Sequence, residues 1–284
     1  MEFESIIGYK AIKLELSRII DQLKHPDKYA ELGVTEPHGL LLHGVPGVGK
    51  STMAQSIIEA SNRKAFVCRK DKSNGDFVNE IVRVFDEAAG AEPSVILLDD
   101  LDKFANEDER HCDAEEFVTV QSCIDKVKDK RVFVVATANN IRKLPGSLTR
   151  PGRFDHILEL RSPEGQDAED IVAFYLSKKS YVADMDVKRI ARLLEGRSCA
   201  QLESVVNTWL RVVLEIVGDV EVGDEFVHCG YVFTALSKNL AISNNFLGCA
   251  KYMDEELLPY VANPETECTI GAVISTMIHL GCLQ

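Results

Sequence analysis

Over the first 160 residues, short apolar runs alternate with segments whose apolar residues recur at helical spacing. The apolar runs predict buried strands at residues 40–42, 64–68, 95–98 and 131–137. The helical spacing predicts helices at residues 9–24, 53–58, 76–89 and 114–127. Nearly continuous apolar strands are typical of parallel sheets that are covered on both faces. The pattern therefore predicts a doubly wound α/β fold in which helices flank a parallel sheet.

After residue 160 the pattern changes. Helical periodicity without strand alternation predicts helices at residues 168–177, 186–194, 200–216 and 225–238. We therefore expect an α/β domain at residues 1–160, a small all-α domain at 161–248 and a helical tail at 249–284. Within the tail, the mostly apolar stretch 269–283 predicts a helix that needs a packing partner.

The first predicted strand leads into a glycine-rich turn that opens a helix. Residues 44–51 match the pattern GxxxxGK[ST], and its glycines would let consecutive backbone N–H groups point at one anion. Lys50 would supply a positive charge for the β- and γ-phosphates, and Ser51 would offer its hydroxyl to Mg²⁺. Chance matches rarely have both a strand before them and a helix after them. We therefore interpret the turn as a phosphate-binding loop.

Two carboxylates, Asp99 and Asp100, directly follow the apolar run 95–98. A doubly wound fold places its chemistry at the C-terminal ends of its strands. Asp99 is expected to hold the hydration shell of Mg²⁺, and Asp100 is expected to face an attacking water. Alone, the pair could be a solvated turn after a strand. The phosphate loop about 50 residues upstream favours the nucleotide interpretation.

Asn139 follows the last of the four apolar runs, and Arg150 and Arg153 lie on a Pro-Gly turn. Asparagine is common in turns, so Asn139 alone indicates little. The two arginines could simply be solvated. Planar guanidinium groups are, however, suited to donate hydrogen bonds to phosphoryl oxygens. Because a phosphate-binding loop is predicted nearby, we favour a functional role for both arginines.

Composition narrows the function classes. The chain of 284 residues has 32 Lys+Arg, 45 Asp+Glu and a formal charge of −13, and its basic residues do not cluster, which disfavours nucleic acid as a partner. Its eight cysteines form no CxxC pair, which indicates reduced thiols and a cytoplasmic location. No stretch approaches the ~20 apolar residues that span a bilayer, so no membrane segment is expected.

With these motifs in this order, the chain resembles the AAA clade of the AAA+ ATPases over about residues 3–240. The matching parts are the Walker A loop at residues 44–51, the Walker B strand at 95–100, the sensor-1 Asn139, and the paired arginine fingers Arg150 and Arg153. The resemblance implies a P-loop three-layer αβα domain with a parallel five-stranded sheet, followed by a helical lid. It also implies ATP or ADP with Mg²⁺ at subunit interfaces of a ring, usually a hexamer.

The resemblance marks further residues around the nucleotide. The phosphate-loop contacts would be Pro46, Gly47, Val48, Gly49, Lys50, Ser51 and Thr52. Ile7 and Gly8 fall where the family's Ile-Gly-Gly segment meets the adenine. Cys199 and Ala200 fall in a turn whose small residues admit the nucleotide. Tyr175 stands where the family often has a ribose-contacting His, but a core aromatic on a lid helix is an equal alternative.

Two departures from the family pattern affect the expected activity. Asp100 stands where the family has Glu, so we expect slow hydrolysis. Ser73 and Asn74 stand where the family's pore loop has its aromatic grip, and Phe77 is too close to the next helix to replace it. Inefficient threading of polypeptides is therefore expected.

The expected function is an ATPase that couples hydrolysis to conformational remodelling of an unidentified protein partner. The alternative is a nucleotide-gated assembly or scaffold protein with weak or absent hydrolysis, which Asp100 and the missing pore aromatic favour. In the related zinc proteases a peptidase domain follows the lid, but this sequence contains no His-Glu-x-x-His. We expect the tail to be a packing or docking helix, with a degenerate peptidase remnant as a weaker alternative.

Overall fold

The computed structural model describes residues 3, 5–70, 74–104, 115–150, 152–178 and 187–207, and the strand segments 225–228, 231–237 and 240–243. The chain divides into two compact units, Met1–Pro163 and Glu164–Gln284. Each unit is described by itself.

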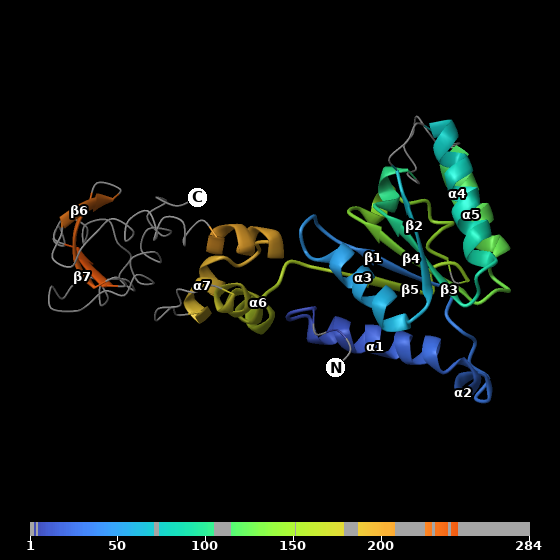
Figure 1. The fold of residues 1–284 in the computed structure, drawn as a ribbon, viewed down its shortest axis with the longest axis horizontal. Coiled ribbons are helices and arrows are strands. Elements are labelled where there is room, and N and C mark those ends of the chain that lie inside the picture. The colour runs from blue at the N-terminus through green and yellow to red at the C-terminus, as the bar shows by residue number, and fades with distance from the viewer. Residues whose placement is uncertain are drawn as a thin grey trace. The chain divides into compact units, whose positions relative to one another are not determined.

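The first unit contains a five-stranded sheet in the order β2-β3-β4-β1-β5 (Figure 1). Its strands are β1 (Gly39–His43), β2 (Lys64–Arg69), β3 (Ser94–Asp99), β4 (Val132–Ala138) and β5 (His156–Glu159). Every neighbouring pair is parallel, which confirms the parallel sheet. Because parallel strands all end at the same edge, this sheet brings the residues that follow β1, β3 and β4 together.

Helices cover both faces of this sheet, with α1 and α3 on one face and α4 and α5 on the other (Figure 1). The helices of the first unit are α1 (Lys10–Lys24), α2 (Pro26–Ala30), α3 (Lys50–Ser61), α4 (Asn74–Ala89) and α5 (Glu115–Lys126). Two short 3₁₀ turns follow the central strands, η1 (Leu101–Lys103) after β3 and η2 (Ile141–Lys143) after β4. This is the three-layer αβα arrangement that the apolar pattern predicts.

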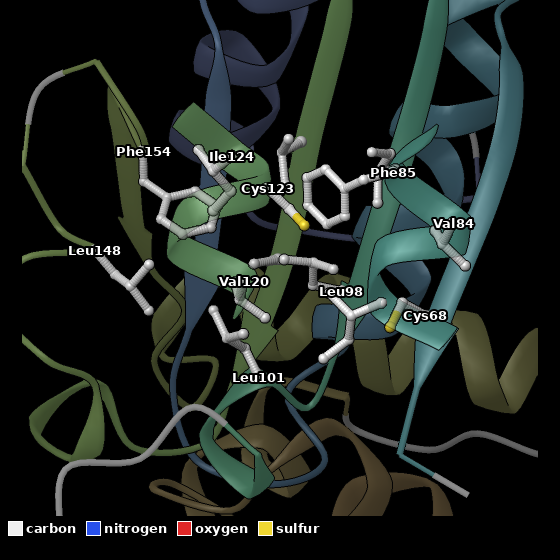
Figure 2. Close-up of a cluster of buried hydrophobic side chains, with 14 of the residues drawn as sticks. Cys68, Val84, Phe85, Leu98, Leu101, Val120, Cys123, Ile124, Leu148 and Phe154 are labelled. Carbon is white, nitrogen blue, oxygen red and sulfur yellow. The ribbon is translucent and has the colours of Figure 1, made fainter. Parts of the chain in front are cut away.

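The core between α4, α5 and the sheet extends to the segments that carry the candidate chemistry (Figure 2). Leu101 of η1 is fully buried in it, next to the end of β3. Leu148 and Phe154, which flank the arginine turn, are also buried there, at 0% and 1% exposure. Burial of a side chain of this size contributes roughly 1.5–3 kcal/mol. Apolar packing therefore fixes both ends of the arginine turn.

The second unit begins with α6 (Gly165–Ser177) and α7 (Val187–Leu193), and residues 199–207 are helical. It then has an antiparallel sheet of β6 (Glu225–His228), β7 (Tyr231–Ser237) and β8 (Leu240–Ser243). The helix predicted at residues 225–238 is therefore wrong. Aromatic and β-branched residues such as Val227, Tyr231 and Val232 favour strands, and this preference prevails over the apparent helical spacing. The helix predicted at 269–283 lies outside the described residues.

Candidate nucleotide site

The loop between β1 and α3 has the backbone that its glycines predict. Gly44, Gly47 and Gly49 have φ values of 150°, 81° and 95°, which side chains with a Cβ rarely adopt. At Gly44 a Cβ would also lie 2.0 Å from the carbonyl oxygen of Leu160. Buried Val48 anchors the loop, and α3 begins at Lys50. The first N–H groups of a helix have no partner within it, so this loop end presents donors suited to an anion.

Lys50 turns back over this loop and is 6% exposed. Its Nζ donates hydrogen bonds to the carbonyl oxygens of Gly44 (2.8 Å) and Val45 (2.9 Å). Burial lowers the pKa of Lys50, and the carboxylates of three nearby aspartates act against this shift. Those aspartates are Asp100, Asp102 and Asp99. Lys50 is therefore a desolvated cation between the loop and the acidic end of β3.

Asp99 links the loop to the ends of two strands. The Ser51 hydroxyl donates to Asp99 Oδ1 over 3.4 Å, and the Thr137 hydroxyl donates to the same oxygen over 2.7 Å. Arg69, the last residue of β2, forms an ion pair with Asp99 Oδ2. Burial raises the pKa of Asp99, but the hydrogen bonds from Thr137, Arg69 and Ser51 outweigh burial and hold it below its ordinary value. Asp99 is thus an ionised carboxylate although it is only 3% exposed.

Asp100 is held on three sides at the start of η1. Its backbone is left-handed, with φ 56°, and its N–H donates to the Thr137 hydroxyl over 2.8 Å. The Asn139 side-chain amide donates to Asp100 Oδ1 over 3.2 Å, and Lys103 Nζ donates to Oδ2 over 2.6 Å. The structure thus brings Asp100 and Asn139 into contact, as the parallel sheet requires of residues that follow neighbouring strands.

Several residues that hold Asp99, Asp100 and Asn139 in place were not predicted from the sequence. Thr137 bridges the two aspartates, and buried Asp102 accepts hydrogen bonds from the backbone N–H groups of Asn139 (3.0 Å) and Asn140 (3.2 Å). Arg69 contacts Asp99, although the two are 30 residues apart. One signal was present in the sequence, because Arg69 directly follows the predicted strand 64–68, as Asp99 follows the apolar run 95–98.

The two arginines of the Pro-Gly turn differ in environment. The side chain of the exposed Arg150 has no hydrogen-bond or ion-pair partner among the described residues, and only its backbone carbonyl accepts a hydrogen bond, from the N–H of Arg153 (3.2 Å). Arg153 donates from Nε and Nη2 to the two carboxylate oxygens of Asp125 on α5 (3.1 and 2.6 Å), and from Nη1 to the carbonyl of Ser147 (2.5 Å). These hydrogen bonds, with help from Lys128, lower the pKa of Asp125 to about 2. Arg153 is therefore fixed within its own unit.

The remaining predicted residues fall in two places. In the first unit, Ile7 is half-buried, Gly8 has φ 67°, and the following Tyr9 donates its hydroxyl to the carbonyl of Arg161 (2.8 Å). Around the loop itself, Pro46 and Thr52 are exposed.

In the second unit, Tyr175 is half-buried on α6, and burial, then Glu203, raises its pKa to about 12. Cys199 is half-buried and Ala200 is exposed at the start of the 199–207 helix. Contact of these residues with a nucleotide stays a prediction.

Phe77 is not available as a pore aromatic. It lies in α4, is fully buried, and makes an edge-to-face contact with Phe104 at a ring separation of 5.0 Å. This agrees with the expectation that Phe77 belongs to the helix. Residue 73 of the expected pore segment lies outside the described residues.

Within the described part of the chain, no three His, Cys, Asp or Glu side chains converge in the way that a self-contained metal site requires. Mg²⁺ rarely uses such a cage, because it keeps several waters and binds one or two carboxylates together with substrate phosphates. The Ser51 hydroxyl and the ionised Asp99 carboxylate, side by side at the loop, fit that mode of binding. None of the helices in the described ranges has the length and apolarity that a membrane crossing requires.

Comparison with known proteins agrees with this geometry. Residues 40–162 match the family described as "ATPase family associated with various cellular activities (AAA)". The chain is 29% identical over 215 residues to the ATP-dependent zinc metalloprotease FtsH of Ureaplasma parvum, which covers 73% of this chain and 30% of the relative. It is 30% identical over 235 residues to the FtsH of Mycoplasmopsis synoviae, covering 78% and 35%.

A eukaryotic relative gives the same result. The chain is 30% identical over 216 residues to the ATP-dependent zinc metalloprotease YME1 homolog of Caenorhabditis elegans, covering 72% of this chain and 30% of the relative. The chain thus spans about a third of the length of the curated relatives it matches. Motifs, sheet order and comparisons agree that residues 40–162 form an AAA-family ATPase domain, which resembles the ATPase module of the zinc metalloproteases.

Proposed function

We propose that this chain binds ATP with Mg²⁺ at the loop 44–51 and hydrolyses it slowly at the interface between two copies of itself. The observation that carries the proposal is the hydrogen bond between Ser51 and Asp99, which joins the phosphate loop to the acidic end of β3. A phosphate-binding loop and a carboxylate that holds Mg²⁺ must lie this close to serve one nucleotide.

Different groups of the loop and of Asp99 would bind the phosphates and the Mg²⁺ ion. The backbone N–H groups of the loop and of the start of α3 would bind the phosphates, and Lys50 would exchange its hydrogen bonds to two loop carbonyls for phosphate oxygens. Ser51 and Asp99 would hold Mg²⁺. When bound, this ion neutralises charge on the phosphate oxygens. Thr137 keeps Asp99 ionised and oriented.

Asp100 is our candidate for the group that accepts a proton from the attacking water. Asn139 holds one of its oxygens and Lys103 the other, so the carboxylate has a fixed direction. Aspartate is one methylene shorter than the family's glutamate, which withdraws the carboxylate by about 1.5 Å. A general base must come within roughly 2.6–3.2 Å of the proton it takes, directly or through one water. Slow hydrolysis follows from this mismatch.

Arg150 is our candidate for the residue that acts on the nucleotide of a neighbouring copy, because its exposed side chain has no partner among the described residues. Such arginines stabilise the charge of the transition state. Arg153 would position the turn through Asp125. A ring, usually a hexamer in this family, would satisfy this arrangement. Ile7, Gly8, Tyr175, Cys199 and Ala200 stay predicted nucleotide contacts, each within its own unit, and a cytoplasmic location remains part of the proposal.

Hydrolysis would be coupled to remodelling of a protein partner, as the resemblance to ATP-dependent proteases suggests. These 284 residues contain no His-Glu-x-x-His motif, so the proposal includes no peptidase step within them. Burial of Phe77 supports the expectation that polypeptide threading is inefficient. The competing proposal is a scaffold that binds ATP without turnover, and the departure at Asp100 favours it.

Steady-state release of phosphate from Mg–ATP, measured over a range of protein concentrations, separates these proposals. We expect the rate per subunit to rise with concentration, because the site needs an arginine from a second copy. Arg150→Ala should keep ATP binding and lose about 10³-fold in rate. Arg192→Ala, which removes an exposed arginine of α7, is the matched control and should behave as wild type. Bound ATP without release at any concentration would support the scaffold instead.

A further inference from the structure

Arg69 lies at the site without a role in the proposed chemistry. It is the last residue of β2, one of the two edge strands of the described sheet, and its register partner in β3 is Asp99. Its guanidinium donates to Asp99 Oδ2. The two side chains differ sharply in exposure, at 65% for Arg69 and 3% for Asp99. A solvent-exposed cation is therefore paired with the buried carboxylate on which the proposed metal site depends.

The hydrogen bonds of Asp99 show what this pairing does. Ser51 and Thr137 donate to Oδ1, whereas Arg69 alone among the described residues donates to Oδ2. Oδ2 is therefore the oxygen that the protein's own cation holds. A metal ion or its bound water needs the same negative charge, and two cations on one carboxylate repel each other. A Mg²⁺ ion bound at Asp99 would therefore compete with Arg69 for this carboxylate.

The surroundings of Arg69 would allow its side chain to move away from Asp99. Among the described residues, no strand lies beyond β2 in the sheet order, and most of the Arg69 side chain is in contact with solvent. Its other electrostatic partner, Asp100, acts at longer range and is itself held by Lys103. When Arg69 leaves, the hydrogen bond from Thr137 still orients Asp99. The pair can therefore open without disturbing the strand ends.

We propose that Arg69 is a built-in competitor of Mg²⁺, which neutralises Asp99 and releases it when Mg²⁺ and nucleotide bind together. Arg69 is thus a positioning residue that raises the Mg²⁺ concentration needed for nucleotide binding. This inference rests on the proposed binding of Mg²⁺ and nucleotide at the loop. It does not depend on hydrolysis or on assembly.

The test is a titration of Mg²⁺ against the full chain mixed with a fluorescent N-methylanthraniloyl ADP, read as bound nucleotide. Arg69→Gln should lower the Mg²⁺ midpoint about tenfold, because a charge-assisted hydrogen bond no longer opposes the ion. Arg69→Lys, which keeps the charge but loses the planar donor, should give a smaller shift.

The matched control is Lys64→Gln, which removes one positive charge from the other end of β2. Lys64 is about 16 Å along the strand from Arg69, at roughly 3.3 Å per residue. This exceeds the Debye length of about 8 Å at physiological salt, so the midpoint should change less than about twofold.

A second measurement covers the case in which Arg69→Gln is unstable. In EDTA the variant should melt at a lower temperature than wild type, because Asp99 loses the cation that donates to its Oδ2. Mg²⁺ with ADP should then raise its melting temperature by more than it raises that of wild type. Equal gains in both proteins would contradict the competition.

The outcomes separate this inference from the proposed function. If wild type binds the nucleotide with Mg²⁺ dependence but Arg69→Gln has the midpoint of Lys64→Gln, competition is wrong and the nucleotide site stands. If Arg69→Gln weakens binding equally in EDTA, Arg69 is a phosphate ligand and the inference is overturned. If nucleotide binding does not depend on Mg²⁺, Asp99 holds no metal ion in the complex, and the inference is again overturned. If wild type binds no nucleotide at all, the proposed function and the inference both fail.

Discussion

Asp100 is the residue on which the proposed turnover depends. Its left-handed backbone, φ 56°, is one that aspartate and asparagine adopt more readily than most residues. Asn139 and Lys103 together engage both of its carboxylate oxygens, so the side chain has little freedom to move toward a water. A longer side chain at this position would reach further from the same strand end.

Asp100→Glu should therefore raise the turnover number for Mg–ATP. A misplacement of about 1 Å can cost on the order of 10²-fold, so the gain can approach that size. Asp100→Asn should slow turnover below wild type, because the amide cannot accept the proton. Both rates are read at saturating Mg–ATP.

Nucleotide affinity is the internal control for these variants and should stay within about threefold of wild type, since Asp100 does not bind the phosphates. Absence of turnover in both the wild type and Asp100→Glu, with ATP still bound, would contradict the enzyme proposal and favour the scaffold.

The sequence indicates the residues of the motifs, but not the residues that hydrogen-bond to them and hold them in place. Lys50, Ser51 and Asp99 follow from a pattern with fixed spacing, and the structure brings them together. Thr137 and Arg69 belong to common residue types on two different strands, and only the order of the strands places them at Asp99. A single sequence has no signal for such contacts beyond the rule that parallel strands end at one edge.

The turn that carries the arginines is the element in which packing and charge act together. The side chains of Leu148 and Phe154, one on each side of the turn, are buried in the core. Arg153 connects the turn to α5 by hydrogen bonds to Asp125. Arg150 lies between these anchors and is exposed. In this element Arg153 is fixed by hydrogen bonds, whereas the side chain of Arg150 is exposed to solvent, as its proposed role on a neighbouring copy requires.

The ion pair of Asp125 and Arg153 should make the stability of the protein depend on acidity. The pKa of Asp125 in the folded protein, about 2, is below its ordinary value, so the folded state holds its proton less tightly than the unfolded chain. The stabilisation is therefore complete above the ordinary pKa of about 4 and is lost as the pH falls toward about 2.

Asp125→Asn should lower the melting temperature at pH 7, by an amount that corresponds to about 1 kcal/mol or less because the carboxylate is partly exposed. The difference from wild type should hold from pH 7 to about pH 5 and shrink below about pH 4. Asp129→Asn, at an exposed site just after α5, is the matched control and should show no such trend. A difference that persists unchanged at the lowest pH would show that the ion pair is not its cause.

At the scale of elements, the buried strands were the most predictable and the partly exposed ones the least. β1, β3 and β4 are continuous apolar runs that must be buried on both faces. β5 alternates between half-buried and exposed residues over four positions, and the apolar pattern alone did not place it. The strands at 225–228 and 231–237 were mistaken for one helix at 225–238, because short segments fit both periods.

For the molecule as a whole, the motifs and the fold describe one ATPase domain and a second unit that follows it. The curated relatives are about three times as long as the matched region, so activity, partners and assembly of the whole protein are proposals here. The proposals share one premise: the loop 44–51 binds the phosphates of a nucleotide. Turnover, assembly and metal competition all depend on it.

Calorimetric titration of ADP with Mg²⁺ into the full chain tests that premise most directly, with Lys50→Ala as the variant and Lys64→Ala as the matched control. We expect wild type and control to bind, and Lys50→Ala to bind about tenfold to a hundredfold more weakly, because it loses its charge-assisted hydrogen bonds to phosphate. Circular dichroism would establish that the variant is folded. An unchanged affinity in folded Lys50→Ala would contradict the assignment of the phosphate loop.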